Sequence, residues 1–259
     1  MTTSSKTAVV PFPTADALPD LSKAEHLRLV TEEAMVRIVA RVLGGRFRYC
    51  HSSGAWFVWR DSHWARDMTD QITDECRRLA QFHAEGQDSH VRRMLGRAST
   101  IFAVERLARS DRAFAVTAAD WDRDPMLLAT PGGTIDLGTG ELRPADPVDA
   151  MTKCTAVSPS IGAACPRWTQ FLDEITGGDG ALIRFLQQFA GYCLTGATKE
   201  QALLFIWGPG GNGKSVFLNV LSGILGDYAA VASMDTFTAS KGDRHPTDVA
   251  MLAGARLVT

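Results

Sequence analysis

The sequence has little of what marks membrane, secreted or metal-binding proteins. No apolar run approaches the roughly 20 residues that a membrane-spanning helix needs. The N-terminal stretch MTTSSKTAVVPFPTADALPDLSK has no hydrophobic region of a signal peptide. The five cysteines are an odd number and never have the C-x-x-C spacing, and the histidines never have the H-x-x-x-H spacing. These absences argue against a disulfide framework and a zinc site, and we expect a cytoplasmic protein without a membrane partner.

The chain also lacks an excess of charge of either sign. Lys and Arg number 27 and Asp and Glu 29, so the formal net charge of -2 gives no global field that would attract nucleic acid. Any DNA contact must therefore come from a local cluster of basic residues. Residues 77–112 supply one, with eight arginines against four acids. From it we take Arg92, Arg93 and Arg97 as candidate DNA contacts; the competing interpretation is a solvated helix face with ion pairs.

Composition and patterning divide the chain into four segments. Residues 1–20 are rich in Ser, Thr, Pro and Ala without any period, and they are predicted to be a disordered leader. Residues 21–158 are predicted to form a mostly α-helical α+β domain with a small β-meander. Residues 159–196 are predicted to be a helical linker or subdomain, and residues 197–259 to begin an α/β P-loop ATPase domain.

The elements of the α+β domain follow from apolar spacing and turn residues. Apolar residues from Leu27 to Val42 recur every three or four positions, which predicts one amphipathic helix that Gly44 and Gly45 end. The stretch FRYCHSSGAWFVWRDSHWARD predicts the meander; its three tryptophans are interpreted as core side chains, with base stacking as the alternative. Helices are predicted over 69–83 and 89–109. The segment MLLATPGGTIDLGTGELRP predicts a hairpin with a glycine-rich turn.

Three more elements are predicted before residue 208. Two helices are expected over 167–175 and 180–194, separated by Gly177 and Gly178. The six-residue apolar run ALLFIW, from Ala202 to Trp207, is of the kind found in a strand that is buried on both faces.

A glycine-rich loop follows this run and opens a helix. The loop fits G-x-x-x-x-G-K-[ST], and the spacing of VFLNVLSGIL predicts the helix after it. Glycines let backbone amides approach an anion at a helix N-terminus, a lysine brings a full charge to the β- and γ-phosphates, and a serine hydroxyl can ligate Mg²⁺. We therefore predict that a nucleoside triphosphate binds with Mg²⁺, that Lys214 is the catalytic lysine and that Ser215 is the magnesium ligand. The predicted nucleotide-binding residues are Gly208, Pro209, Gly210, Gly211, Asn212, Gly213, Lys214 and Ser215.

A complete P-loop NTPase needs more than this loop. It needs an acidic residue at the end of a second strand, and oligomeric motors add an arginine finger from a neighbour. The acids in the tail that follows Ser215 are Asp227, Asp235, Asp243 and Asp248. None of them follows an apolar strand, so no catalytic base is assigned; Ala255–Val258 resembles the start of a strand. We expect an α/β core that is incomplete at the C-terminus and that binds ATP without efficient hydrolysis.

The second half of the chain resembles the phage/plasmid primase family, the primase-helicases whose motor is a superfamily 3 helicase. Four runs carry the resemblance and cover roughly Ala118 to Thr259, and the weaker WFVWRDSHWARD extends it toward residue 40. The runs are WDRDPMLLATPGGTIDLGTGELRP, CPRWTQFLDEITGG, FLQQFAGYCLTGATKEQALLFIWGPGGNGKSVFLNVLSGILGDY and MDTFTASKGDRHPTDVAMLAGARLVT.

The resemblance implies a fold and an activity. It implies a mostly helical domain followed by an AAA+-like ATPase that forms a homo-oligomeric ring, usually a hexamer, on single-stranded DNA and unwinds duplex DNA with ATP and Mg²⁺. It makes Gly208–Ser215 the Walker A loop, and it implies that the acidic Walker B pair comes just past Thr259. It also implies replication of a mobile element in the cytoplasm of a bacterial host. The N-terminal region has no primase polymerase domain.

Two other classes of function stay open. The alternatives to the helicase are a DNA-binding or assembly module with an inert P-loop, and a P-loop kinase that acts on a small molecule. A GTPase is less favoured, because the two asparagines, Asn212 and Asn219, make no N-K-x-D guanine motif in these residues. A kinase is less favoured because some 200 residues precede a loop that usually opens that fold.

Overall fold

The computed structural model describes residues 31–160, 162–200, 203–233 and 252–259. The chain forms two compact units. Unit 1 comprises residues up to Val58 and Asp67–Thr117, and unit 2 comprises Trp59–Arg66 and Ala118–Thr259. The predicted leader and the start of the first predicted helix lie outside the described residues. Among the described residues, none of the helices has the length and apolarity that crossing a bilayer requires.

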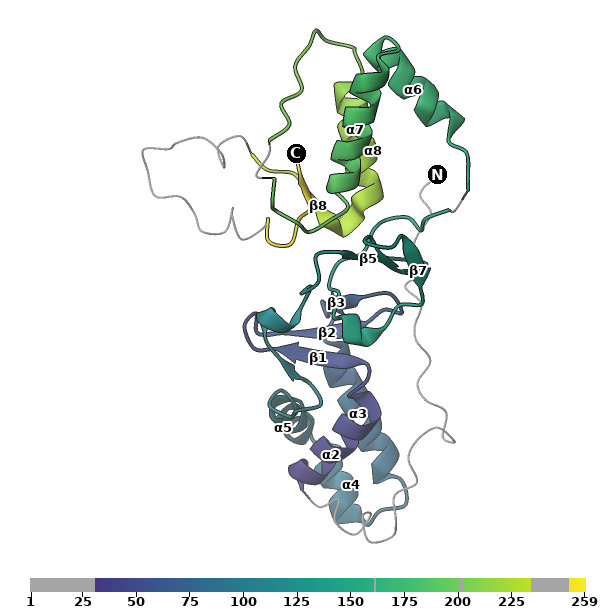
Figure 1. Ribbon diagram of the computed structural model, residues 1–259. Coiled ribbons are helices and arrows are strands. Elements are labelled where there is room, and N and C mark those ends of the chain that lie inside the picture. Colours follow the sequence, from purple (N-terminus) through teal and green to yellow (C-terminus); the bar gives the residue numbers. More distant parts are fainter. Residues whose placement is uncertain (1–30, 161, 201–202, 234–251) are drawn as a thin grey trace, which may run out of the picture. The chain divides into compact units, whose positions relative to one another are not determined.

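The described part of unit 1 is built mainly from four helices, labelled in Figure 1. Thr31 caps the first of them, because its hydroxyl accepts a hydrogen bond from the backbone N–H of Ala34 at 3.2 Å. The carboxylate of Asp88 caps the third by accepting from two backbone N–H groups, those of His90 at 2.8 Å and Val91 at 2.9 Å. The helices are α2 (Glu32–Leu43), α3 (Gln71–Ala84), α4 (Ser89–Leu95) and α5 (Ala98–Ala108).

The sequence predicted one helix over 89–109, and this prediction is wrong. The structure has two helices, with Gly96 as the C-cap of α4 and Arg97 before α5. A glycine inside a helical pattern costs about 1 kcal/mol relative to alanine. Here the break lets Leu95 and Ile101 both reach the core of unit 1, as their burial shows.

Two strands of unit 1 lie where the aromatic stretch predicted the meander. β1 (Phe47–Cys50) pairs antiparallel with β2 (Ala55–Trp59) and parallel with the short β4 (Ala115–Val116). The register of the β1–β2 hairpin places Tyr49 opposite Trp56. Gly54, with φ of +62°, makes the turn that closes this hairpin.

Two of the three tryptophans of the meander are core side chains, as interpreted from the sequence, whereas Trp59 is partly exposed. Trp56 is 6 % exposed and lies edge-on to Tyr49 and Phe114, with ring centroids 5.1 Å and 5.4 Å away. Trp64, in β3 (Trp64–Arg66) of unit 2, is 1 % exposed, and its indole N–H donates to the carbonyl of Pro147 at 2.9 Å. Their burial leaves neither of these rings free to stack on bases.

Unit 2 contains a three-stranded antiparallel sheet in the order β5-β6-β7 and three longer helices. The sheet therefore has two successive hairpins, where the sequence predicted one. Helices α7 and α8 run side by side in Figure 1, and apolar residues of both belong to one core with β5. The bounds are β5 (Leu127–Thr130), β6 (Gly133–Asp136), β7 (Glu141–Arg143), α6 (Pro166–Thr176), α7 (Gly180–Tyr192), α8 (Lys214–Leu225), β8 (Ala229–Ala230) and β9 (Leu257–Val258).

The shared core of unit 2 explains why its bounds differ from those of the segments predicted from the sequence. The predicted boundaries at residues 158 and 196 both fall inside unit 2. Leu128 of β5, Leu172 of α6 and Leu221 of α8 are buried in the same apolar cluster. Segments that share one core fold as one unit, whatever their composition.

The prediction of a doubly buried strand over 202–207 is wrong for the residues that the structure describes. Residues 203–207 have no strand assignment. Their side chains alternate: Leu204 and Ile206 are partly covered, whereas Leu203, Phe205 and Trp207 are 90 %, 79 % and 84 % exposed. A strand buried on both faces needs hydrogen-bonded neighbours and cover on each side, which an apolar run does not supply by itself.

Near the C-terminus, β8 and β9 form a short parallel pair. The predicted strand Ala255–Val258 thus has a counterpart in β9. Arg256, one residue before β9, holds this pair to the rest of unit 2. Its guanidinium donates to the carbonyls of Leu194 and, at 2.6 Å, of Leu127, and it lies 4.3 Å from the ring centroid of Tyr228. The predicted helix around Val249–Leu252 falls almost wholly outside the described residues.

Candidate functional site

The glycine-rich loop runs directly into helix α8. Gly213 is the N-cap of α8, has φ of +83° and offers no side-chain cap, so the first backbone N–H groups of the helix lack the usual partner. Gly208, at the other end of the loop, leaves room for the Asn212 amide, because a Cβ there would lie 2.5 Å from Nδ2 of Asn212. The loop therefore needs glycine at both ends, and it presents free amides at the positive end of a helix dipole.

Lys214 turns back over the loop. Its Nζ donates to the carbonyls of Gly208 and Pro209, both at 2.9 Å, and to Oδ1 of Asn212 at 2.6 Å. All three acceptors are neutral, so none of these contacts neutralises the positive charge of the ammonium group. The lysine is thus held at the mouth of the loop by groups that an anion can replace.

Ser215 and the loop amides border one small cavity. The cavity has a volume of about 340 Å³ and is lined by residues 210–216. Ser215 is exposed, so its hydroxyl is available to a ligand or a metal ion. The structure thus brings the predicted residues Gly210 to Ser215 together around one space, while Gly208 and Pro209 contribute carbonyls that hold Lys214.

Helix α6 packs on this loop, which the sequence did not indicate. A Cβ at Gly213 would lie 2.5 Å from Cγ2 of Ile175 and 3.1 Å from Cε2 of Phe171. The ring of Trp168 stacks on Phe217 of α8, with centroids 5.9 Å apart and planes at 13°. The three-and-four spacing of 168, 171, 172 and 175 predicts an apolar face, but a periodic pattern does not say what that face contacts.

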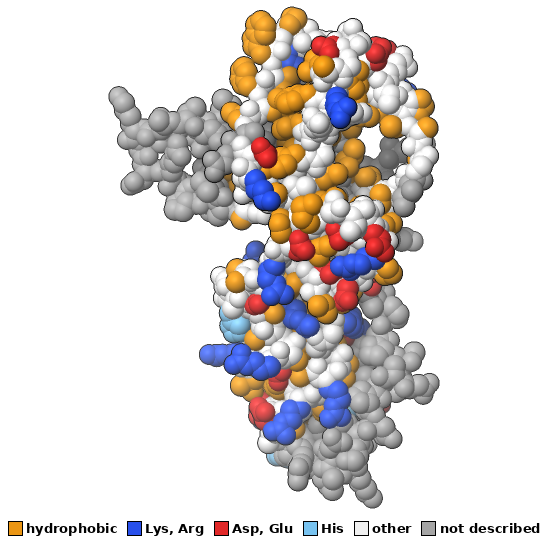
Figure 2. Space-filling view, in the orientation of Figure 1, with side chains coloured by type: hydrophobic (Ala, Val, Ile, Leu, Met, Phe, Trp, Pro, Cys, Tyr) orange, Lys and Arg blue, Asp and Glu red, His pale blue; other side chains and the backbone are white. Residues whose placement is uncertain are grey.

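The arginines predicted to contact DNA lie in unit 1. Arg92 and Arg93 are in α4, Arg97 follows it, and all three are exposed. Arg92 donates to the carbonyl of Gln87 at 3.1 Å. Figure 2 shows several Lys and Arg side chains on the visible face of unit 1, spread over it rather than gathered in one patch. Of the other arginines in the cluster, Arg77 and Arg109 form ion pairs with Asp74 and Glu105.

The acids considered from the sequence do not make a catalytic centre in the described part of the chain. Asp227 accepts a hydrogen bond from the backbone N–H of Cys154 at 3.2 Å, which is a structural contact. Asp235, Asp243 and Asp248 lie outside the described residues. The described residues contain no group of three or more His, Cys, Asp or Glu side chains suited to a metal ion, and their five cysteines are free thiols.

Comparison with known proteins identifies the N-terminal and middle parts of the chain. The model of the D5 N terminal like family matches residues 35–177, which run from α2 to the end of α6. A 65-residue stretch is 38 % identical to the uncharacterized mitochondrial protein ymf21 of Marchantia polymorpha, and it covers 25 % of this chain and 36 % of that protein. This domain is found in phage and plasmid primase-helicase proteins, and the match ends before the glycine-rich loop. The chain belongs to the D5 N terminal like family.

Proposed function

We propose that the loop Gly208–Ser215 binds the triphosphate of ATP with Mg²⁺. The observation that carries the proposal is the continuity of the loop with α8. Gly213 takes a left-handed conformation at the N-cap, and the next residue is a lysine whose ammonium lies on the loop. Free amides, a helix dipole and an ammonium group act on the same small cavity, and each of them favours a polyanion.

The chemistry of binding follows from these groups. Phosphate oxygens accept hydrogen bonds from the loop amides. They also replace Gly208, Pro209 and Asn212 as acceptors of the Lys214 ammonium group, because an anion is a stronger acceptor than these neutral groups. The exposed Ser215 hydroxyl is the group in this cavity that suits Mg²⁺, a cation that prefers oxygen ligands and keeps several waters. Bound Mg²⁺ supplies charge neutralisation between the β- and γ-phosphates.

The wider proposal concerns the activity to which this loop contributes. We infer an ATP-dependent DNA helicase with an AAA+-like α/β P-loop core, which acts as a hexameric ring in the replication of a mobile element. The family match supports a replication role at the level of the domain, because that domain occurs in primase-helicase proteins. The nucleotide loop and the resemblance around it support the helicase part of the proposal.

A charge-matched pair of lysine variants tests ATP binding. Lys214→Ala removes the ammonium from the loop, and Lys199→Ala removes an exposed lysine outside it. Titration calorimetry of the 259-residue chain with Mg-ATP should show binding about tenfold or more weaker for Lys214→Ala, because a charge-assisted contact is lost. Lys199→Ala should bind like the unsubstituted chain. Equal affinity of all three proteins would remove the proposed nucleotide site.

The second candidate is a DNA-binding or assembly module with an inert loop. The exposure of Arg92, Arg93 and Arg97 favours it, since these side chains are available to phosphates. The two candidates differ in whether DNA and nucleotide binding are coupled. Single-stranded DNA should change the affinity for Mg-ATP if the chain is part of a motor, and leave it unchanged if the loop is inert.

A further inference from the structure

A second cavity lies beside the nucleotide loop, between α6 and α8. It has a volume of about 890 Å³, which is in the range of small-ligand sites. Apolar side chains from both helices line it, with polar groups from α6 at its edge. The lining residues are Pro166, Arg167, Trp168, Gln170, Phe171, Glu174, Val216 and Val220. We call this cavity the α6–α8 cleft.

The cleft adjoins the loop cavity. Val216 lines both cavities and directly follows Ser215. Val216 and Val220 are four residues apart in α8 and so lie on one face of the helix. The Val216 side chain is 51 % exposed, which is a large apolar exposure beside a proposed polar site. A nucleotide whose phosphates occupy the loop cavity could therefore place its nucleoside in the neighbouring cleft.

We propose that the α6–α8 cleft holds the adenine base of the nucleotide. The inference rests on the proposed function, since it assumes that the phosphates occupy the loop. The cleft has an aromatic wall: the ring of Trp168 stacks with that of Phe171, with centroids 5.3 Å apart and planes at 28°, and packs against Phe217 of α8. These contacts fix the indole before a ligand arrives, so little side-chain entropy is lost on binding.

Glu174 gives the cleft a recognition group for the base. Its Oε1 accepts a hydrogen bond from Nε2 of Gln170 at 2.8 Å, which orients the carboxylate on α6. A carboxylate only accepts hydrogen bonds when it is ionised. It can therefore accept a hydrogen bond from the 6-amino group of adenine, a contact that a purine without that group does not make. Glu174 is in this sense a specificity-determining residue.

The test compares three ligands on three forms of the chain. The ligands are Mg-ATP, Mg-purine riboside triphosphate, which lacks the 6-amino group, and Mg-tripolyphosphate, which lacks the nucleoside. The proteins are the unsubstituted chain, Glu174→Ala and the control Asp173→Ala. Asp173 is the adjacent exposed acid on α6 and does not line the cleft. Equilibrium affinities are measured for each of the nine pairs.

The unsubstituted chain should bind ATP about tenfold or more tighter than tripolyphosphate, and about tenfold tighter than purine riboside triphosphate. Glu174→Ala should abolish the second difference and leave tripolyphosphate binding unchanged, which also shows that the variant is folded. Asp173→Ala should keep both differences. If tripolyphosphate binds as tightly as ATP, the loop site stands and the base cleft is wrong. If none of the ligands binds, the proposed function and this inference both fail.

Discussion

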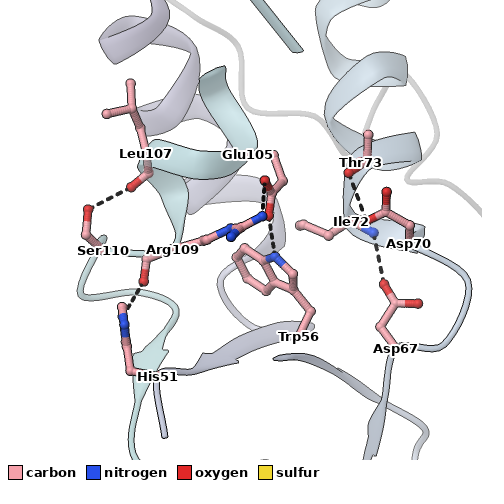
Figure 3. Close-up of polar contacts among 10 residues, drawn as sticks. All are labelled: His51, Trp56, Asp67, Asp70, Ile72, Thr73, Glu105, Leu107, Arg109 and Ser110. Atoms are coloured by element: carbon pink, nitrogen blue, oxygen red, sulfur yellow. Dashed lines mark hydrogen bonds and ion pairs between the residues drawn. The ribbon is translucent and has the colours of Figure 1, made fainter. Parts of the chain in front are cut away.

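The indole N–H of Trp56 donates a 2.6 Å hydrogen bond to Oε1 of Glu105 (Figure 3). The same carboxylate accepts two hydrogen bonds from Arg109. Nε donates to Oε1 at 2.8 Å, and Nη2 donates to Oε2 at 2.9 Å. Glu105 is 4 % exposed, so a buried charge joins strand β2 to helix α5. Both of its oxygens are used, as a buried carboxylate requires.

Replacement of Glu105 should destabilise unit 1 strongly. In Glu105→Ala the buried indole N–H loses its acceptor and Arg109 loses its counter-charge, so we expect a loss of about 3 kcal/mol in the free energy of unfolding. Chemical denaturation followed by tryptophan fluorescence measures this loss. Asp74→Ala is the matched control, because it breaks the exposed ion pair with Arg77 and should cost less than about 1 kcal/mol. Similar losses for the two variants would show that the buried carboxylate is not important for stability.

Arg256 should contribute to the stability of unit 2. Its partly buried guanidinium, whose pKa burial lowers from the ordinary value, donates to two carbonyls in segments far apart in the sequence. Arg256→Met keeps much of the side-chain volume but leaves both carbonyls without this donor, so we expect a loss of about 2 kcal/mol in the free energy of unfolding. The exposed Arg123 provides the control variant Arg123→Met, for which thermal unfolding should be almost unchanged. An unfolding midpoint for Arg256→Met equal to that control would contradict this role.

Local sequence signals predicted several elements to within a residue. Helix α6 was expected over 167–175 and spans Pro166–Thr176, because a proline opens it and Gly177, with φ of +64°, ends it. Helix α7 begins at Gly180 as expected, since the Asp179 carboxylate accepts from the backbone N–H of Ala181 and of Leu182. Caps and breakers act within one turn of the chain, so their effect is readable from the sequence.

The features that depend on distant contacts were not predictable in this way. The split at Gly96 and the exposed side chains of 203–207 depend on which faces find cover in the folded unit. The motif named the loop residues from Gly208 to Ser215, yet the contact of Ile175 with Gly213 and the α6–α8 cleft arise from tertiary packing. A sequence motif therefore predicts the chemical groups of a site better than it predicts the side chains that pack around it.

The exposed arginines of unit 1 should contribute to DNA affinity through phosphate contacts. Arg92→Ala combined with Arg93→Ala removes two charges from α4. Binding to a single-stranded oligonucleotide should weaken, and the slope of log affinity against log salt should become less negative by about 1.4, since each phosphate contact on single strands contributes about 0.7. Fluorescence anisotropy over a series of salt concentrations measures both quantities. An unchanged slope would show that these residues form a solvated face with no role in binding.

Substitution of Gly213 should damage the nucleotide loop through two separate effects. Its φ of +83° is unfavourable for a residue with a Cβ, and that Cβ would lie 2.5 Å from Cγ2 of Ile175. We expect Gly213→Ala to weaken Mg-ATP binding by about tenfold or more, because α6 or the loop must move. Gly191→Ala is the control, since Gly191 lies in α7 outside the loop and a Cβ there meets no atom within 4 Å. Adding Ile175→Ala to Gly213→Ala should restore the part of the affinity lost to the collision and leave the part lost to backbone strain. If the double variant binds no better than Gly213→Ala alone, α6 does not press on the loop as the structure shows.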